Sequence, residues 1–164
     1  MTLEHEINDT NKYYLENDIA VIYKKPTPVK VLKRVNEKIV KAYFEKPSTT
    51  DYNGLYNGHY IDFEAKETKN TSSFPLDNIH THQINHIRNV IKHKGICFII
   101  IRFTKLNETY LLFGKDFINF IQNNTRKSIP IEYFKEKGYI IKDKLMPAVD
   151  YLEIINKYGG ILWN

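Results

Sequence analysis

The sequence has little cysteine and no long apolar run, and both absences narrow the class of protein. Its 164 residues include one cysteine, so no intramolecular disulfide can form. That residue, Cys97, lies in the apolar run Gly95–Ile99, which predicts a buried and unreactive thiol. No apolar stretch approaches the ~18 residues of a membrane span. Because Met1–Glu6 holds two acids and no basic region, we also expect no export signal. We therefore expect a cytoplasmic protein without membrane association.

Internal repeats, low-complexity tracts and domain linkers are absent as well. The length suits one domain over residues 1–164, which is long enough to bury one core and too short for two. With 42% hydrophobic and 13% aromatic residues, the chain has the composition of a folded globule rather than of a disordered protein.

Positive charge is concentrated in one segment. The whole chain has a formal net charge of +5, from 24 basic and 19 acidic residues. From Lys24 to Lys46 eight bases face only Glu37 and Glu45, so this segment alone exceeds the net charge of the chain. Such a concentration indicates a polyanionic partner such as nucleic acid, and the alternative is a solvated lysine-rich surface.

Apolar periodicity and turn residues predict an α/β fold in which a mixed central sheet is flanked by helices. Thr2 is a helix cap for the first element, and two prolines, Pro26 and Pro28, separate the first strand from an extended hairpin. Gly95 is placed at the end of the second long helix. The expected helices are residues 2–17, 79–91, 117–121 and 151–155, and the expected strands are residues 19–23, 49–56, 59–67, 96–103, 109–113 and 139–141, with the hairpin at 29–44.

The strands 49–56 and 59–67 are joined at Asn57–Gly58, the strongest short-range signal for a hairpin. With these two residues as the loop, Asp51 lies opposite Glu64, and Thr49 lies opposite Lys66. Since side chains alternate along a strand, all four project from one face of the sheet. The hairpin therefore presents two carboxylates, a hydroxyl and a lysine together.

Two directly opposed carboxylates have Cβ atoms about 4.5–5.5 Å apart and destabilise each other unless something neutralises them. Lys66 is one candidate for that role, and a divalent cation bound by both carboxylates is the other, because Mg²⁺ prefers carboxylate and water ligands. The alternative interpretation is an ordinary half-exposed sheet with cross-strand charge pairs.

The pattern Glu64-X-Lys66 after an isolated Asp51 is that of the PD-(D/E)XK nuclease superfamily. A longer set of matching segments resembles the RecU family of Holliday-junction resolvases, and the resemblance runs from Met1 to the C-terminal helix. The matching segments are Ser48–Gly54, Tyr60–Lys69, Ser73–Leu76, His82–Ile84 and Gly95–Phe98.

The resemblance implies a restriction-endonuclease-like core and an enzyme. Its activity would be structure-selective, Mg²⁺-dependent hydrolysis of phosphodiesters that resolves four-way DNA junctions symmetrically during homologous recombination and DNA repair. It further implies Mg²⁺, with Mn²⁺ as an alternative ion, bound by Thr49, Asp51, Glu64 and Gln83. In this scheme Lys66 stabilises the transition state, and Asp51 and Glu64 are catalytic as well as metal-binding. Gln83 follows from the resemblance alone, and by itself its position suggests a surface amide.

The resemblance also gives the basic segment a role. It implies a homodimer with a stalk at residues 26–44 that inserts into the open centre of the junction. A recombinase or a branch-migration helicase is implied as a further partner. The expected phosphate contacts are Lys30, Lys33, Arg34, Lys38 and Lys41.

Other interpretations remain open at this point. His80, His82 and His86 form a cluster that suits either a transition metal or a solvated surface facing DNA. Glu4 and Glu6 are candidates for a further acid from the first helix. A protein that binds junctions without cutting them, or a nuclease for linear duplex DNA, would have the same fold.

Overall fold

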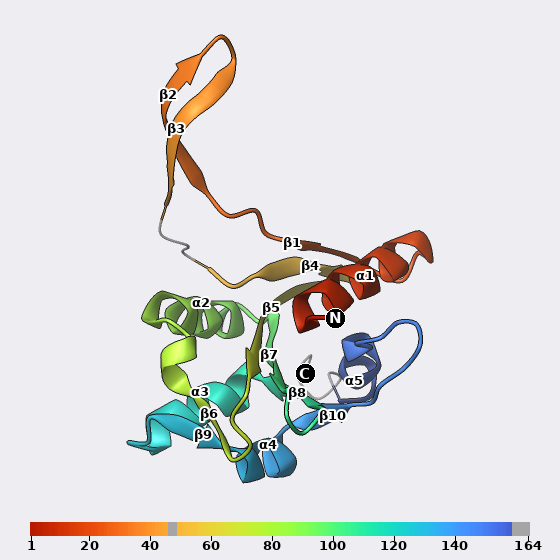
Figure 1. Ribbon diagram of the computed structural model, residues 1–164. Helices are drawn as coiled ribbons and strands as arrows, with labels where there is room; N and C mark the ends of the chain where they lie inside the picture. The colour runs from red at the N-terminus through yellow and green to blue at the C-terminus, as the bar shows by residue number, and fades with distance from the viewer. Residues whose placement is uncertain (46–48, 159–164) are drawn as a thin grey trace.

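The computed structural model describes residues 1–45 and 49–158 and contains one mixed sheet flanked by helices (Figure 1). The strand order is β1-β4-β5-β7-β8-β10; β5 and β7 are parallel, and the other neighbours are antiparallel. The fold class expected from the sequence is thereby confirmed. The strands are β1 (Val21–Lys24), β4 (Tyr52–Tyr56), β5 (His59–Thr68), β7 (Ile96–Phe103), β8 (Glu108–Phe113) and β10 (Tyr139–Ile141).

Helices cover both faces of the sheet and enclose two apolar cores. On one face, α1 and α5 pack on Ile61, Phe63 and Phe98. On the other face, α2 and α3 pack on Ile99 and Ile101. None of the described helices is long and apolar enough to cross a membrane. The helices are α1 (Leu3–Glu16), η1 (Leu76–Asn78), α2 (Thr81–Lys92), α3 (Gly114–Asn123), α4 (Ile131–Lys137) and α5 (Tyr151–Tyr158).

Strands β2 (Val29–Val35) and β3 (Lys38–Phe44) form a separate hairpin that projects away from the sheet (Figure 1), and we call this hairpin the stalk. Its turn residues Asn36 and Glu37 have φ angles of 47° and 66°. Such left-handed values match the twist of a two-residue hairpin turn. Nearly all of the stalk is exposed, including Leu32 and Val40.

Caps, turn residues and apolar periodicity predict most of the helices and strands, and the structure differs from these predictions in three places. The hydroxyl of Thr2 accepts from the backbone N–H of His5 and caps α1 as expected. The sequence places the left-handed residue that ends α2 at Gly95, one residue too late, because Lys94 (φ 64°) takes that position. Gly95 is needed for space instead: a Cβ there would lie 2.7 Å from Val90 Cγ1. Strand β4 is shorter than expected, and the patterns did not predict α4, β6 (Ser73–Pro75) or β9 (Ser128–Pro130).

Candidate functional site

The hairpin β4–β5 has the register that the Asn57–Gly58 turn predicts. Tyr52 pairs with Phe63, and the pairing continues to Tyr56 opposite His59. The turn residues have φ angles of 47° and 79°, so the glycine occupies a left-handed position that it adopts without steric cost. The predicted register is therefore confirmed over the paired strands.

The prediction that Thr49 lies opposite Lys66 is wrong, because the ladder ends at Tyr52. The backbone N–H of Asp51 donates to Glu64 Oε2 at 3.1 Å instead of to a backbone carbonyl of β5. The carbonyl of Asp51 accepts from the N–H of Lys25 at 2.7 Å. Asp51 thus stays bonded to the chain after β1 but has left the ladder with β5, and Thr49 lies in a bend before the strand. Asp51 and Glu64 nevertheless stay together.

Glu64 is a fully buried carboxylate on the sheet face that α2 and α3 cover. Burial, together with the nearby negative charge of Asp51, raises the pKa of Glu64 to about 7, although the Lys66 ammonium acts in the opposite direction. Lys66 Nζ lies 2.6 Å from Glu64 Oε1. Lys66 thus neutralises the carboxylate pair only in part.

The donor set at this place fits a hard divalent cation. Among the described residues, Glu64 Oε1 is buried and makes an ion pair with Lys66, but no hydrogen bond of regular geometry. Asp51 is half-buried beside it. Two close carboxylates in a site of low dielectric constant need additional positive charge, and oxygen ligands of this kind suit Mg²⁺.

Gln83 is buried, and the interpretation of a surface amide is therefore wrong. It lies in the first turn of α2, and its Oε1 accepts the backbone N–H of His80 at 2.9 Å. A carbonyl oxygen has a second lone pair, so this cap leaves Gln83 able to act as a ligand. The sequence carried no independent signal for its burial.

The three histidines do not form a metal centre. His80 and His82 stack with ring centroids 5.5 Å apart, whereas His86 points elsewhere and its Nε2 lies 2.9 Å from Asp62 Oδ2. In the part of the chain that the structure describes, no group of three or more His, Cys, Asp or Glu residues could hold a metal ion. The zinc interpretation is thus wrong for these residues, and His86 is not simply a solvated side chain.

Asp62 is a polar centre that sequence reasoning missed. Alternation along β5 places Asp62 on the same face as Glu64, but three of its four hydrogen-bond partners come from other segments of the chain. Burial alone would raise the pKa of Asp62, but hydrogen bonds from His86, Thr50, Tyr60 and Lys25 outweigh it and hold the pKa below its usual range. The carboxylate is therefore ionised inside the protein.

Glu4 and Glu6 have other partners. Glu4 pairs with Lys24, and Glu6 pairs with Arg102 at 2.5 Å. Both belong to α1, which packs on the sheet face opposite to that of Glu64.

The predicted phosphate contacts all lie on the stalk. The hairpin pairing places Lys30 and Arg34 on one strand and Lys38 and Lys41 on the other, with Lys33 opposite Lys41. All five are exposed, so the stalk presents its charge to solvent. Lys46 of the basic segment and Ser48 of the matching segments lie outside the described residues.

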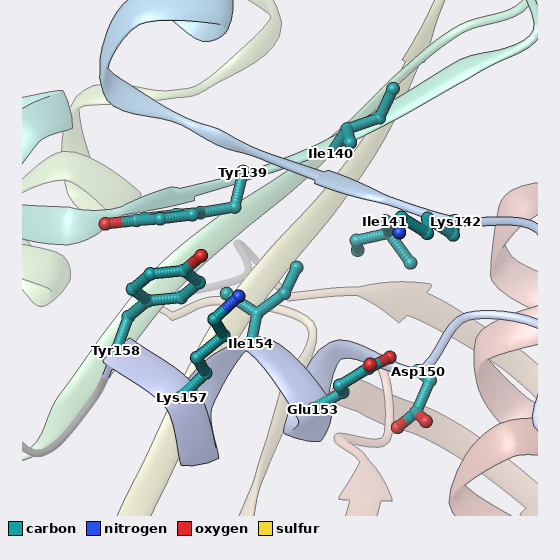
Figure 2. Close-up of a pocket in the computed structure, with 9 residues that line it drawn as sticks. All are labelled: Tyr139, Ile140, Ile141, Lys142, Asp150, Glu153, Ile154, Lys157 and Tyr158. Carbon is teal, nitrogen blue, oxygen red and sulfur yellow. The ribbon is translucent and has the colours of Figure 1, made fainter.

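Two further features have no part in the proposed metal site, although Cys97 is the neighbour of Asp62 across β5 and β7. Cys97 is buried and burial raises the pKa of its thiol, as the prediction of an unreactive cysteine requires. A pocket of about 280 Å³ lies between β10 and α5, where Tyr139 and Tyr158 stack (Figure 2). It contains none of the predicted site residues.

A mixed sheet with a buried carboxylate beside a half-buried one, an adjacent lysine and a projecting basic hairpin is typical of a nuclease. The comparison with protein families supports this class: the family model of RecU, recombination protein U, matches residues 1–157. The chain belongs to the RecU family of Holliday junction resolvases.

Relatives named Holliday junction resolvase RecU match nearly the whole chain. The protein of Streptococcus thermophilus is 52% identical over 98% of this chain and 84% of its own length. That of Pediococcus pentosaceus is 50% identical over 96% of this chain and 82% of its own length. Among solved structures, the Holliday junction resolvase Hjc of Archaeoglobus fulgidus matches with a TM-score of 0.47 and 9% identity, over 82% of this chain and 95% of that chain.

Proposed function

We propose that this nuclease resolves four-way DNA junctions by Mg²⁺-dependent hydrolysis of one phosphodiester in each of two opposed strands. The observation that carries the proposal is the Asp51–Glu64–Lys66 group on a family member with a basic stalk. Cleavage at symmetric positions further requires two active sites, which a homodimer with a two-fold axis would supply. A recombinase or a branch-migration helicase would be a partner that delivers the junction.

In the proposed site, the carboxylates of Asp51 and Glu64 hold the ion, with Thr49 and Gln83 as further oxygen ligands. The bound ion would polarise a phosphate oxygen and lower the pKa of the attacking water. Lys66 places a positive charge beside Glu64 Oε1, where it can stabilise the negative charge that develops on the phosphate. The stalk bases Lys30, Lys33, Arg34, Lys38 and Lys41 would contact the phosphates of the junction arms.

The test is cleavage of a mobile four-way junction and of a linear duplex of matched sequence, each with Mg²⁺, with Mn²⁺ and with EDTA. We expect paired nicks in the junction only, none with EDTA, and none with Asp51→Asn. Asp9→Asn is the control, because Asp9 is an acid on the exposed side of α1. Equal cutting of the duplex would instead identify a general nuclease, and tight binding without any cutting would identify an accessory protein.

A further inference from the structure

Asp62 is a fully buried carboxylate for which the proposed chemistry has no use. Its Oδ2 lies 2.9 Å from Lys25 Nζ, 2.7 Å from the hydroxyl of Tyr60 and 2.9 Å from His86 Nε2. Its Oδ1 accepts the hydroxyl of Thr50. Burying a charge is costly unless it is paired and hydrogen-bonded, and here four donors meet that requirement.

Three of the four donors, Thr50, Tyr60 and His86, come from the segments that carry the proposed metal ligands. Thr50 lies between the proposed ligands Thr49 and Asp51, and His86 follows Gln83 by about one turn of α2. Asp62 itself precedes Glu64 by two residues in β5, so both carboxylates project from the same face. One carboxylate thus joins the loop before β4, the strand β5 and the helix α2.

Lys25 adds the base of the stalk to this network. Its backbone N–H donates to the carbonyl of Asp51 at 2.7 Å, and its ammonium also contacts the hydroxyl of Thr50 at 2.9 Å. Pro26, the next residue, begins the connection to β2. Lys25 therefore connects the stalk to the loop that carries Asp51.

We propose that Asp62 is a positioning residue of the nuclease site, which holds the three ligand-bearing segments and the stalk base in register without contacting the ion. The inference rests on the proposed function, since it concerns the same metal site. Groups that orient metal ligands typically contribute 10–100-fold to metal affinity or activity. A residue that only stabilises the fold would change thermal stability and leave the affinity of the folded protein for metal unchanged.

The test measures Mn²⁺ binding directly, by electron paramagnetic resonance of the free ion, on the full chain. Loss of binding in Asp51→Asn identifies the site that is measured. We expect Asp62→Asn to bind Mn²⁺ about 10–100-fold more weakly than the natural chain, and Asp62→Glu to recover part of the loss. The matched control is Asp150→Asn, because Asp150 also accepts bonds from a tyrosine and a lysine but lies on the other face of the sheet. Asp150→Asn should bind Mn²⁺ as tightly as the natural chain.

A folded Asp62→Asn with the natural Mn²⁺ affinity would overturn the inference. If Asp62→Asn does not fold, Thr50→Val and His86→Leu decide the matter, since each removes one hydrogen bond to Asp62, and natural affinity in both would overturn the inference. The cleavage assay judges the proposed function separately. A natural chain that binds Mn²⁺ but does not cut junctions contradicts that function, and the Mn²⁺ comparison still decides the role of Asp62.

Discussion

Two hairpins of this protein share one kind of turn and differ in the strands and helices that surround them. The stalk turns at Asn36–Glu37 and the site hairpin at Asn57–Gly58, and all four residues have positive φ angles. Strands β4 and β5 have β1 and β7 as outer neighbours and helices over both faces. Within the described residues, β2 and β3 pair only with each other.

The difference shows how surroundings decide what a charged residue does. In the site hairpin, burial and the charge of Asp51 raise the pKa of Glu64 to about 7, so either a proton or a cation stabilises this carboxylate. On the stalk, Lys30 and Lys38 are exposed and act as charges that salt can screen. A two-stranded hairpin is marginally stable by itself in water, so bound DNA should order the stalk further.

The largest effect is expected for Lys66→Met, which removes the cation beside Glu64. Junction cleavage under single-turnover conditions should fall by about 10²–10³-fold, the usual loss when one group that stabilises transition-state charge is removed. The pH dependence should also move to higher pH, because Lys66 lowers the pKa of Glu64. Binding of the junction to the stalk should not change, and a loss of binding equal to the loss of cleavage would contradict the division between the two hairpins.

Changes in the stalk should weaken junction binding and leave metal binding unchanged. Replacing three of its bases by alanine should weaken junction binding and reduce the slope of log K against log salt by about 3, roughly one ion for each lost phosphate contact. Fluorescence anisotropy at several KCl concentrations measures this slope, and Mn²⁺ affinity should stay as in the natural chain. An unchanged slope would exclude the stalk as the phosphate-binding surface. The stalk variant changes Lys33, Arg34 and Lys41, and the control changes the exposed bases Lys12, Lys105 and Lys135 of the body.

Metal binding should depend on pH through Glu64. Because its pKa is about 7, protons compete with the ion below that pH, and Mg²⁺ affinity should fall by about tenfold per pH unit from pH 7 to pH 5. Isothermal titration calorimetry at each pH measures the affinity. Glu64→Gln should bind weakly at every pH. A flat profile in the natural chain would show that Glu64 is not a ligand.

Without metal, Glu64→Gln should stabilise the fold. The pKa of Glu64 in the folded protein lies above the value of 4.5 that is usual for a glutamate side chain, so the folded protein binds the proton more tightly than the unfolded chain. Stability is therefore greatest below about pH 4.5 and is lost as the pH rises through 7. At pH 8 the variant should gain about 1–3 kcal/mol in the free energy of unfolding, measured by urea denaturation with EDTA. The gain should vanish near pH 4.5, and an equal gain at both pH values would contradict the assigned cause.

The smallest effect concerns the turns themselves. Gly58→Ala places a Cβ at a φ of 79° and should lower the free energy of unfolding by about 1 kcal/mol, because the site hairpin is part of the sheet. Glu37→Ala at the equivalent stalk position should leave it within about 0.5 kcal/mol. Chemical denaturation of both variants gives the comparison, and equal losses would mean that the stalk folds as one unit with the sheet.

The sequence by itself determined the local features. The Asn57–Gly58 turn set the register that brings Asp51 to Glu64, Thr2 set the start of α1, and a continuous apolar run marked β7. Each of these depends on backbone conformation or side-chain periodicity over a few residues. The family resemblance added Gln83, which no local pattern singled out.

Only the tertiary structure decided which polar groups are buried and what they contact. The partners of Asp62 lie 2 to 37 residues away along the chain, and the bond from Asp51 to Glu64 ended the ladder before Thr49. The pKa of Glu64 likewise depends on the helices that exclude water from its face of the sheet. Desolvation and pairing between distant segments are properties of the packed chain, so residue order alone could not supply them.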